Sequence, residues 1–421
     1  MTIDDALTAI RALHFAACLV ASGTVFVMAA VVVPAARASA PEGFGQLRRS
    51  AALLALGALA LAILSGGAWL ALVSAQILGV SPTDAVLGGG IDEVFTATRF
   101  GTLAATRLGL ALALAPLVAY GRLTIVQISL AAAFLMLLAL AGHAGATPGP
   151  AGDIHRAADM AHLLAAGAWL GGLPAFILSL AAAGREETKS WLDFLVGITR
   201  RFSILGVLCV AILPASGVVN SWYLLSGLSD LWTTDYGRII ALKIGLFALM
   251  IAIAAYNKFR LTPRLPGQPA LDHLEWAVWV ETTIGLCVVL AVAVAGKMEP
   301  TAHGHPQPVD IPPEAAFVHI HDADAMADVT VDPGHVGSAN VTIRVSREDF
   351  TIYPATVVTL ALDPPDTSEG RIERSASEQN DGTWTVNGLA LARAGKWIVR
   401  VKVMNRSGQA IVLDAPIVID R

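Results

Sequence analysis

Charged residues are scarce in this sequence. They make up 14% of its 421 residues, whereas soluble domains carry about 25%. The formal net charge of −5 contains no basic excess, so the composition predicts no nucleic-acid partner. Most of the chain is therefore expected to lie in lipid rather than in water.

Cysteine is also rare, which excludes a disulfide framework. The three cysteines, Cys18, Cys209 and Cys287, all lie inside apolar runs, and the sequence contains no CxxC pair. Catalytic motifs are missing as well, because there is no nucleophile elbow, P-loop, dinucleotide fingerprint or HExxH. We therefore predict a protein that is not an enzyme and does not use ATP.

Long apolar runs are abundant instead. The sequence is 55% hydrophobic, and a membrane-spanning helix needs about 20 predominantly apolar residues. Residues 38–40 resemble a signal cleavage site, but the apolar run before them is too long for a signal peptide, so we expect an uncleaved first span. Eight spans are predicted, at approximately 7–33, 51–75, 103–120, 124–143, 158–183, 203–226, 238–260 and 274–296.

Basic residues in the loops predict the orientation of these spans. The loops on one side of the membrane are rich in basic residues, whereas the loops on the other side hold only Arg99, Arg156 and, at a helix start, Arg238. The richer side is predicted to be cytoplasmic, which places both termini outside the cytoplasmic (inner) membrane. Its basic residues are Arg37, Arg48, Arg49, Arg122, Arg185, Lys189, Arg200, Arg201, Lys258, Arg260 and Arg264.

The composition changes after Lys297. Residues 298–316 are rich in proline and include His303 and His305, which predicts a stiff linker after a membrane domain at 1–297. Residues 317–421 alternate β-branched and polar residues in about seven short runs, which favours a small sandwich outside the membrane. The predicted fold is an all-α membrane bundle of about eight transmembrane helices followed by an all-β immunoglobulin-like sandwich.

Histidines gather near the predicted outer mouth of the bundle. His155, Asp159 and His162 stand at i, i+4 and i+7, so they share one helix face. His143 ends the preceding span and His14 lies about two turns into the first span. Imidazoles with a carboxylate suit copper or zinc. The alternative is a set of interfacial histidines bonded to backbone, with Asp159 as a cap or a partner of Arg156.

The first span adds softer groups to this set. Cys18 follows His14 at i+4, and Met28 returns to nearly the same direction ten residues later. A stripe of imidazole, thiol and thioether would suit Cu(I), whereas the alternative is that Cys18 and Met28 are ordinary core residues.

Ionisable groups at membrane depth are rare and indicate function. Glu281 is the deepest, and we expect it to be paired, protonated or part of a cation path, with Asn257 or Asn220 as a hydrogen-bond partner. Asn220 follows the proline and glycine of the sixth span and needs a partner inside the bundle. Lys243 and Arg107 lie about two turns from the outer side, where they are expected to extend toward water.

The C-terminal domain carries its own histidines. His319 and His321, at i and i+2 on a predicted strand, point the same way. Together with His303, His305 and His335 they form a second candidate metal site, and the alternative is a solvated strand face.

Three segments give the chain a family resemblance. HLLAAGAWLGGLPAF at 162–176, RRFSILGVLCVAILPASGVVNSW at 200–222 and YGRIIALKIGLFALMIAIAAYNKFRLTPRL at 236–265 resemble the copper resistance protein D (CopD) family of membrane proteins. The resemblance covers roughly residues 1–297. It implies copper movement across the cytoplasmic membrane, usually uptake, with copper delivered by a small β-sandwich copper-binding protein.

The C-terminal domain is similar to YtkA-like sandwiches that are fused to such transporters. It lacks the N-terminal histidine of the copper resistance protein C domains. We therefore predict copper transport through a His/Asp/Cys site at the outer mouth, in the direction of uptake that the family resemblance implies. Two alternatives stay open: a non-transporting copper-delivery factor for an oxidase, and a haem-binding electron-transfer protein with His14, His143 or His162 as axial ligands.

Overall fold

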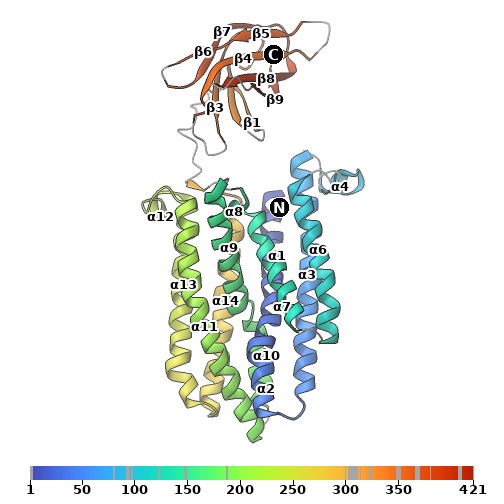
Figure 1. Ribbon diagram of the computed structural model, residues 1–421, viewed down its shortest axis with the longest axis vertical. Coiled ribbons are helices and arrows are strands. Elements are labelled where there is room, and N and C mark those ends of the chain that lie inside the picture. The colour runs from blue at the N-terminus through green and yellow to red at the C-terminus, as the bar shows by residue number, and fades with distance from the viewer. Residues whose placement is uncertain are drawn as a thin grey trace. The chain divides into compact units, whose positions relative to one another are not determined.

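The chain folds into two compact units, Met1–Ala302 and His303–Arg421, in a computed structural model (Figure 1). The first unit is a helical bundle and the second consists of strands. The structure describes residues 3–78, 81–91, 95, 98–121, 124–146, 149–185, 188–298, 300–301, 312, 314–321, 325–347, 352–365, 370–379, 381–405 and 410–420.

Eight helical segments of the first unit are long and apolar enough to cross a membrane, which confirms the predicted number of spans. Several extend beyond the predicted boundaries. The sixth begins at Lys189 rather than at 203, because its first turns are amphipathic and bury Trp191 and Phe194 against the bundle. The eight segments are Asp5–Ser39, Phe44–Gln76, Phe100–Tyr120, Thr124–Ala141, Ala151–Ala183, Lys189–Leu224, Asp235–Arg264 and Gln268–Ala295.

Four of the spans are single helices, and the other four are made of two or three consecutive elements. The elements are α1 (Ile3–Val27), the π-helix η1 (Met28–Val32), α2 (Val33–Ser39), α3 (Phe44–Leu78), α4 (Pro82–Leu87), α6 (Arg99–Tyr120), α7 (Thr124–Met136), the 3-10 helix η2 (Leu137–Ala141), α8 (His143–Ala146), α9 (Gly149–Trp169), α10 (Leu173–Ala183), α11 (Lys189–Leu224), α12 (Asp230–Thr233), α13 (Asp235–Tyr256), the π-helix η3 (Asn257–Leu261), the 3-10 helix η4 (Thr262–Arg264) and α14 (Gln268–Ala295).

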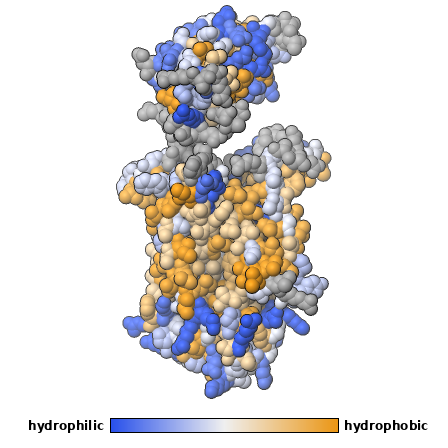
Figure 2. All heavy atoms as spheres, in the orientation of Figure 1, coloured by the Kyte–Doolittle hydropathy of each residue, from blue (hydrophilic) through white to orange (hydrophobic). Residues whose placement is uncertain are grey.

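The bundle has an apolar belt between two polar ends (Figure 2). Leu242, Ile244 and Leu249 of α13 are among the large apolar side chains exposed on it. An apolar surface of this extent requires lipid. Ten of the basic residues that predict the cytoplasmic side lie in α2, η3 and η4, just after α10, or in the first part of α3 and α11, and we call this end of the bundle the basic end.

Glycines bring α1 against the junction between α9 and α10. A Cβ atom on Gly23 would lie 2.2 Å from the carbonyl carbon of Gly171, and one on Gly171 would lie 2.0 Å from the carbonyl oxygen of Leu19. The two backbones therefore touch directly, and a side chain on either glycine would separate them. The small residues around Gly167 and Gly172 therefore serve close helix packing.

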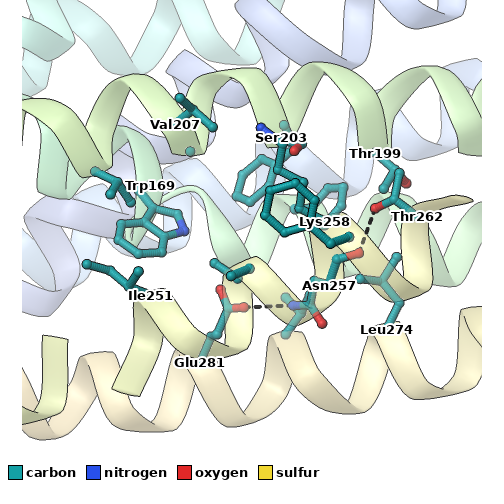
Figure 3. Close-up of a pocket in the computed structure, with 18 residues that line it drawn as sticks. Trp169, Thr199, Ser203, Val207, Ile251, Asn257, Lys258, Thr262, Leu274 and Glu281 are labelled. Carbon is teal, nitrogen blue, oxygen red and sulfur yellow. Dashed lines mark hydrogen bonds between the residues drawn. The ribbon is translucent and has the colours of Figure 1, made fainter. Parts of the chain in front are cut away.

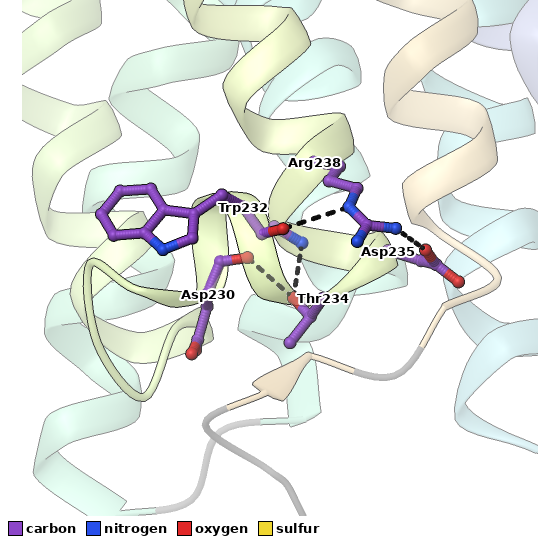
Figure 4. A network of polar contacts seen from close by, with 6 residues as sticks. Asp230, Trp232, Thr234, Asp235 and Arg238 are labelled. Carbon is purple, nitrogen blue, oxygen red and sulfur yellow. Dashed lines mark hydrogen bonds and ion pairs between the residues drawn. The ribbon is translucent and has the colours of Figure 1, made fainter.

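A polar network lies at the end of the bundle opposite the basic end (Figure 4). Thr234 caps α13, because its hydroxyl accepts from the Gly237 amide at 3.0 Å and donates to the Asp230 carbonyl at 3.0 Å. The Asp230 carboxylate accepts from Thr301, which follows α14, at 2.5 Å. This hydrogen bond lowers the pKa of Asp230. The network thus ties the segment between α11 and α13 to the end of the bundle.

The second unit is a two-sheet sandwich. All strand pairs described are antiparallel, in the orders β1-β2-β3-β7-β6 and β5-β4-β8-β9. Val329 and Ile343 of the first sheet pack with Leu360 and Trp397 of the second in one buried core. The strands are β1 (Ala316–His321), β2 (Met326–Asp332), β3 (Gly337–Ser346), β4 (Ala355–Asp363), β5 (Ile372–Ser375), β6 (Ser377–Glu378), β7 (Trp384–Leu391), β8 (Gly395–Asn405) and β9 (Ala410–Ile419).

The sandwich confirms the predicted fold class, with two more strands in its described part than the seven or so predicted. The additional strands are short: β5 has four residues and β6 has two. Their side chains are mostly exposed, so they lack the alternation of apolar and polar residues by which a strand is found in a sequence.

Candidate functional site

His14 and Cys18 form a buried pair on α1. Their side chains are 4% and 0% exposed, and the Cys18 Sγ lies 3.6 Å from the His14 Nε2. The i, i+4 spacing thus produces the shared face that the sequence predicts. The His14 Nδ1 lies 3.0 Å from the carbonyl oxygen of Ala62 on α3, so the hydrogen is assigned to Nδ1. The Nε2 lone pair then faces the same space as the thiol.

Arg107 of α6 occupies that space. Its Nη1 donates to the His14 Nε2 at 2.8 Å and its Nη2 donates to the Cys18 Sγ at 3.0 Å. The guanidinium also lies 5.0 Å from the centre of the Phe134 ring, and the residue is 7% exposed. The expectation that Arg107 extends toward water is therefore wrong, because two acceptors and an aromatic face inside the bundle satisfy it. Its contacts join α6 to α1, a pairing that no spacing in the sequence reveals.

A cavity of about 200 Å³ adjoins this cluster. Its walls include His14 and Arg107 themselves together with apolar groups such as Phe100 and Leu103. The arginine side chain thus has open volume beside it. Met28 lies at the edge of a different apolar cluster, around Val27 and Val31, whereas Cys18 is part of the cluster that contains Phe134.

The predicted His155–Asp159–His162 stripe packs against α11 as an antiparallel ladder. The His155 ring stacks on Tyr223, with ring centroids 4.8 Å apart. The Asn220 Nδ2 donates to the Asp159 Oδ1 at 3.0 Å. The third rung joins His162 to Ser216.

In this rung the His162 Nδ1 lies 3.0 Å from the Ser216 Oγ. The Ser216 hydroxyl itself donates to the Ile212 carbonyl at 2.7 Å, so it accepts from His162. The His162 Nδ1 therefore carries the hydrogen.

Charge near the ladder comes from a third helix. Lys243 of α13 interacts electrostatically with both Asp159 and His162. Arg156 donates instead to Asp153, at 2.5 Å. The partner of Asp159 is thus an amide with a cation close by. Of the two residues predicted as partners of Glu281, Asn220 binds Asp159 instead.

The structure keeps these candidates in separate hydrogen-bond networks. His14 and Cys18 contact α3 and α6, whereas the stripe contacts α11. Within the described part of the chain, no group of three or more His, Cys, Asp or Glu side chains is placed to hold a metal ion. His143 begins α8, but its side chain lies outside the described residues, so a site that includes it stays a prediction.

Glu281 of α14 lies beside a second cavity of about 200 Å³ (Figure 3). The Asn257 Nδ2 donates to the Glu281 Oε1 at 2.8 Å, which identifies Asn257 as the predicted partner. Asn257 begins η3, where the Thr262 hydroxyl donates to its carbonyl at 2.9 Å.

A carboxylate orients His319 of the second unit. The His319 Nδ1 on β1 lies 2.6 Å from the Asp328 Oδ1 on β2, an arrangement in which a carboxylate fixes an imidazole. The His335 Nδ1 lies 3.1 Å from the carbonyl oxygen of Val336. The side chain of His321, and His303 and His305 altogether, lie outside the described residues.

Comparison with known proteins relates this bundle to one family. Residues 196–295 match the family Copper resistance protein D, and residues 2–153 match the family Copper resistance protein D-like, N-terminal domain. The inner membrane protein YebZ of Escherichia coli (strain K12) is 29% identical over 298 residues, which are 69% of this chain and 97% of that protein.

Two further relatives match over part of their length. The copper transport protein CutJ of Bacillus subtilis (strain 168) is 25% identical over 58% of this chain and 43% of its own length. The copper resistance protein D of Pseudomonas syringae pv. tomato is 29% identical over 39% of this chain and 56% of its own length. No solved structure matches the chain significantly. The two family matches lie in the same membrane unit, and this unit therefore belongs to the copper resistance protein D family.

Proposed function

We propose that this chain moves copper across the cytoplasmic membrane, in the direction of uptake, with His14 and Cys18 as the central ligand pair. The observation that carries the proposal is the separation of 3.6 Å between an imidazole nitrogen and a sulfur inside an apolar bundle of this family. Nitrogen and sulfur are the ligands that copper, and Cu(I) above all, prefers.

Copper takes the place of the guanidinium in this proposal. Bonds of about 2.0 and 2.3 Å, the lengths that zinc makes to nitrogen and sulfur, give an angle of about 110° at a metal between atoms 3.6 Å apart. Arg107 donates to both ligand atoms and must leave before a metal reaches them. The adjoining cavity offers the displaced side chain room.

Copper reaches this pair from the end opposite the basic end, which we assign to the outside. The basic residues at the other end favour a cytoplasmic position there. The ladder of His155, Asp159 and His162 begins near the outer end of α9 and supplies imidazole nitrogens and a carboxylate on the way inward. The assignment leaves both chain termini outside, and the name of the E. coli relative supports the inner membrane as the location.

The second unit is proposed to hold its own copper site at His319 and His321, outside the membrane. The carboxylate of Asp328 orients the His319 ring, which is how ligating histidines are commonly supported. A periplasmic copper-binding chaperone is the proposed donor of copper to the outer end.

Copper binding to the purified full chain tests the ligand pair. We expect Cu(I) to bind the wild type and to produce thiolate-to-metal absorption, and we expect Cys18→Ser to lose that absorption. Cys287→Ser, on the exposed face of α14, is the matched control and should bind as the wild type does. Unchanged absorption in Cys18→Ser would remove the pair from the mechanism. Haem absorption in the purified wild type would favour the haem-binding alternative instead.

A further inference from the structure

Glu281 is a buried carboxyl at the middle of a membrane helix. It is 2% exposed and lies 13 residues from the start of α14, or about 20 Å along the axis. Among the described residues, no ion pair involves Glu281, and the group that hydrogen-bonds to it is the neutral amide of Asn257. An ionised carboxylate in such surroundings costs several kcal/mol unless a cation compensates it.

The cavity beside Glu281 runs toward the basic end. Its wall on α11 extends from Val210 to Thr199, which is about 16 Å of helix. The hydroxyl groups of Thr199 and Ser203 line this wall, and Lys258 and Thr262 line the opposite wall (Figure 3). A volume of about 200 Å³ is large enough for several water molecules, and Thr199, Ser203 and Thr262 supply polar groups in a wall that is otherwise mostly apolar. Water and hydroxyl groups can therefore connect the carboxyl to the basic end of the bundle.

We infer that Glu281 is a proton-binding site, which exchanges its proton with the basic end of the bundle through this cavity. The reaction is the binding of one proton to the carboxylate to give the neutral acid. Asn257 can hydrogen-bond to both the ionised and the protonated form of Glu281. Its Nδ2 donates to the carboxylate as observed, and after rotation of the amide its Oδ1 accepts from the protonated carboxyl. That Oδ1 is buried and has no hydrogen-bond partner among the described residues in the present orientation.

The cavity wall contains few titratable groups, and none of them forms an ion pair with Glu281 among the described residues. Lys258 of η3 is the other titratable residue in its wall, whereas α9, α10 and α11 contribute neutral side chains such as Trp169 and Phe176. On α13, Lys243 interacts with Asp159 and His162. On α1, Arg11 lies at the far end of α14, where its Nη1 donates to the Gly296 carbonyl.

Infrared spectroscopy of the reconstituted full chain tests the proton directly. We expect the C=O band of a protonated carboxyl at neutral pH in the wild type. Glu281→Gln should lose one such band, and Asp272→Asn, at an exposed carboxyl of the same helix, should keep it. An identical band in Glu281→Gln and the wild type would overturn the inference. So would loss of the band on addition of sodium, since it would identify a sodium site.

Two glycine variants test the route. A Cβ atom on Gly206, in the cavity wall, or on Gly245, on the exposed face of α13, would meet no atom within 4 Å, so both positions accept a side chain. In heavy water the carboxyl band shifts as the proton exchanges. Gly206→Leu fills the cavity and should slow this shift about tenfold or more, whereas Gly245→Leu should not. Equal rates in both variants would exclude the cavity as the route.

A role of this proton in copper movement rests on the proposed function. In liposomes that contain a pH-sensitive dye, copper uptake by the wild type should change the internal pH. Glu281→Gln should bind Cu(I) normally but produce no pH change. Copper transport by Glu281→Gln with an unaltered pH change would overturn the coupling. If the wild type moves no copper, the proposed function fails, and the infrared result still decides whether Glu281 carries a proton.

Discussion

Arg107 Nη1 lies 2.8 Å from the Nε2 of His14, where a metal ion bound by this nitrogen would have to lie. The guanidinium is a permanent monovalent cation. With Arg107 displaced into the adjoining cavity, Cu(I) adds one positive charge to this buried cluster, whereas Cu(II) adds two, in a medium that penalises charge strongly. The relationship therefore favours Cu(I) as the transported ion, whatever the protonation of Cys18.

Removal of the arginine should strengthen copper binding. Arg107→Gln removes the cation that copper displaces, and hydrogen bonds from charged groups contribute about 1.5–3 kcal/mol each. We expect Cu(I) affinity to rise at least about ten- to hundredfold, which corresponds to one such hydrogen bond, since about 1.4 kcal/mol corresponds to tenfold. Competition with a chromophoric Cu(I) chelator measures the change. Arg156→Gln, which removes an ion pair with exposed Asp153, is the control and should leave the affinity unchanged. Weaker binding in Arg107→Gln would show that the arginine supports the site.

The ladder between α9 and α11 should be needed for uptake. The double variant His155→Ala and His162→Ala removes both imidazoles that we place on the path and leaves Asp159 and Asn220 in contact. Cellular copper accumulation should fall to the level of cells that lack the protein. His273→Ala, at an exposed position of α14, should accumulate copper as the wild type does. Wild-type accumulation in the double variant would exclude these two histidines from the mechanism.

The contact between α1 and the α9–α10 junction should tolerate no side chain. In Gly23→Ala the new Cβ meets the backbone atoms of Gly167, Gly171 and Gly172 at 2.2–2.4 Å. Overpacking of this kind costs about 1–3 kcal/mol or more, so the midpoint of thermal unfolding in detergent should fall. Gly57→Ala, where a Cβ meets nothing within 4 Å, should unfold at the wild-type temperature. Equal stability of the two variants would contradict the backbone contact.

The sandwich should lose stability in acid through Asp363. A hydrogen bond from Arg371, and the charges of Arg371 and Arg400, lower the pKa of this carboxyl. A lowered pKa stabilises the fold fully above the ordinary carboxyl value of about 4, and the contribution disappears as the pH falls through the lowered value. Asp363→Asn should therefore unfold more easily than the wild type near neutral pH.

The difference in stability between Asp363→Asn and the wild type should disappear in acid, below the lowered pKa of Asp363. Fluorine NMR of the fluorotryptophan-labelled full chain, read at buried Trp397, follows unfolding of this unit. A difference that persists unchanged in acid would contradict the role of the Asp363 charge.

The sequence predicts the architecture well because membrane helices and alternating strands follow from local patterns. The run around Leu242 and Leu249 marks a span without reference to any other helix. The shared face of His155, Asp159 and His162 follows from helical periodicity alone. Their partners Tyr223, Asn220 and Ser216 do not, since they depend on the register of α9 against α11.

Arg107 shows why the chemistry of the central pair was harder to predict. From the sequence it is a cation two turns inside a span, which normally extends to water. Its contacts with His14 and Cys18 arise from the packing of α6 beside α1, separated by about ninety residues of chain. Glu281 is the opposite case, since its depth in the span predicts that it has a partner inside the bundle. Only the structure shows that this partner is Asn257 rather than Asn220.

Copper uptake into proteoliposomes of known orientation, with Cu(I) and Cu(II) compared, tests the central claim most directly. We predict that the wild type transports Cu(I) faster than Cu(II) from the side opposite the basic end, and that His14→Ala and Cys18→Ser reduce this flux to the leak of empty liposomes. Flux of Cu(I) through both variants at the wild-type rate would contradict the account.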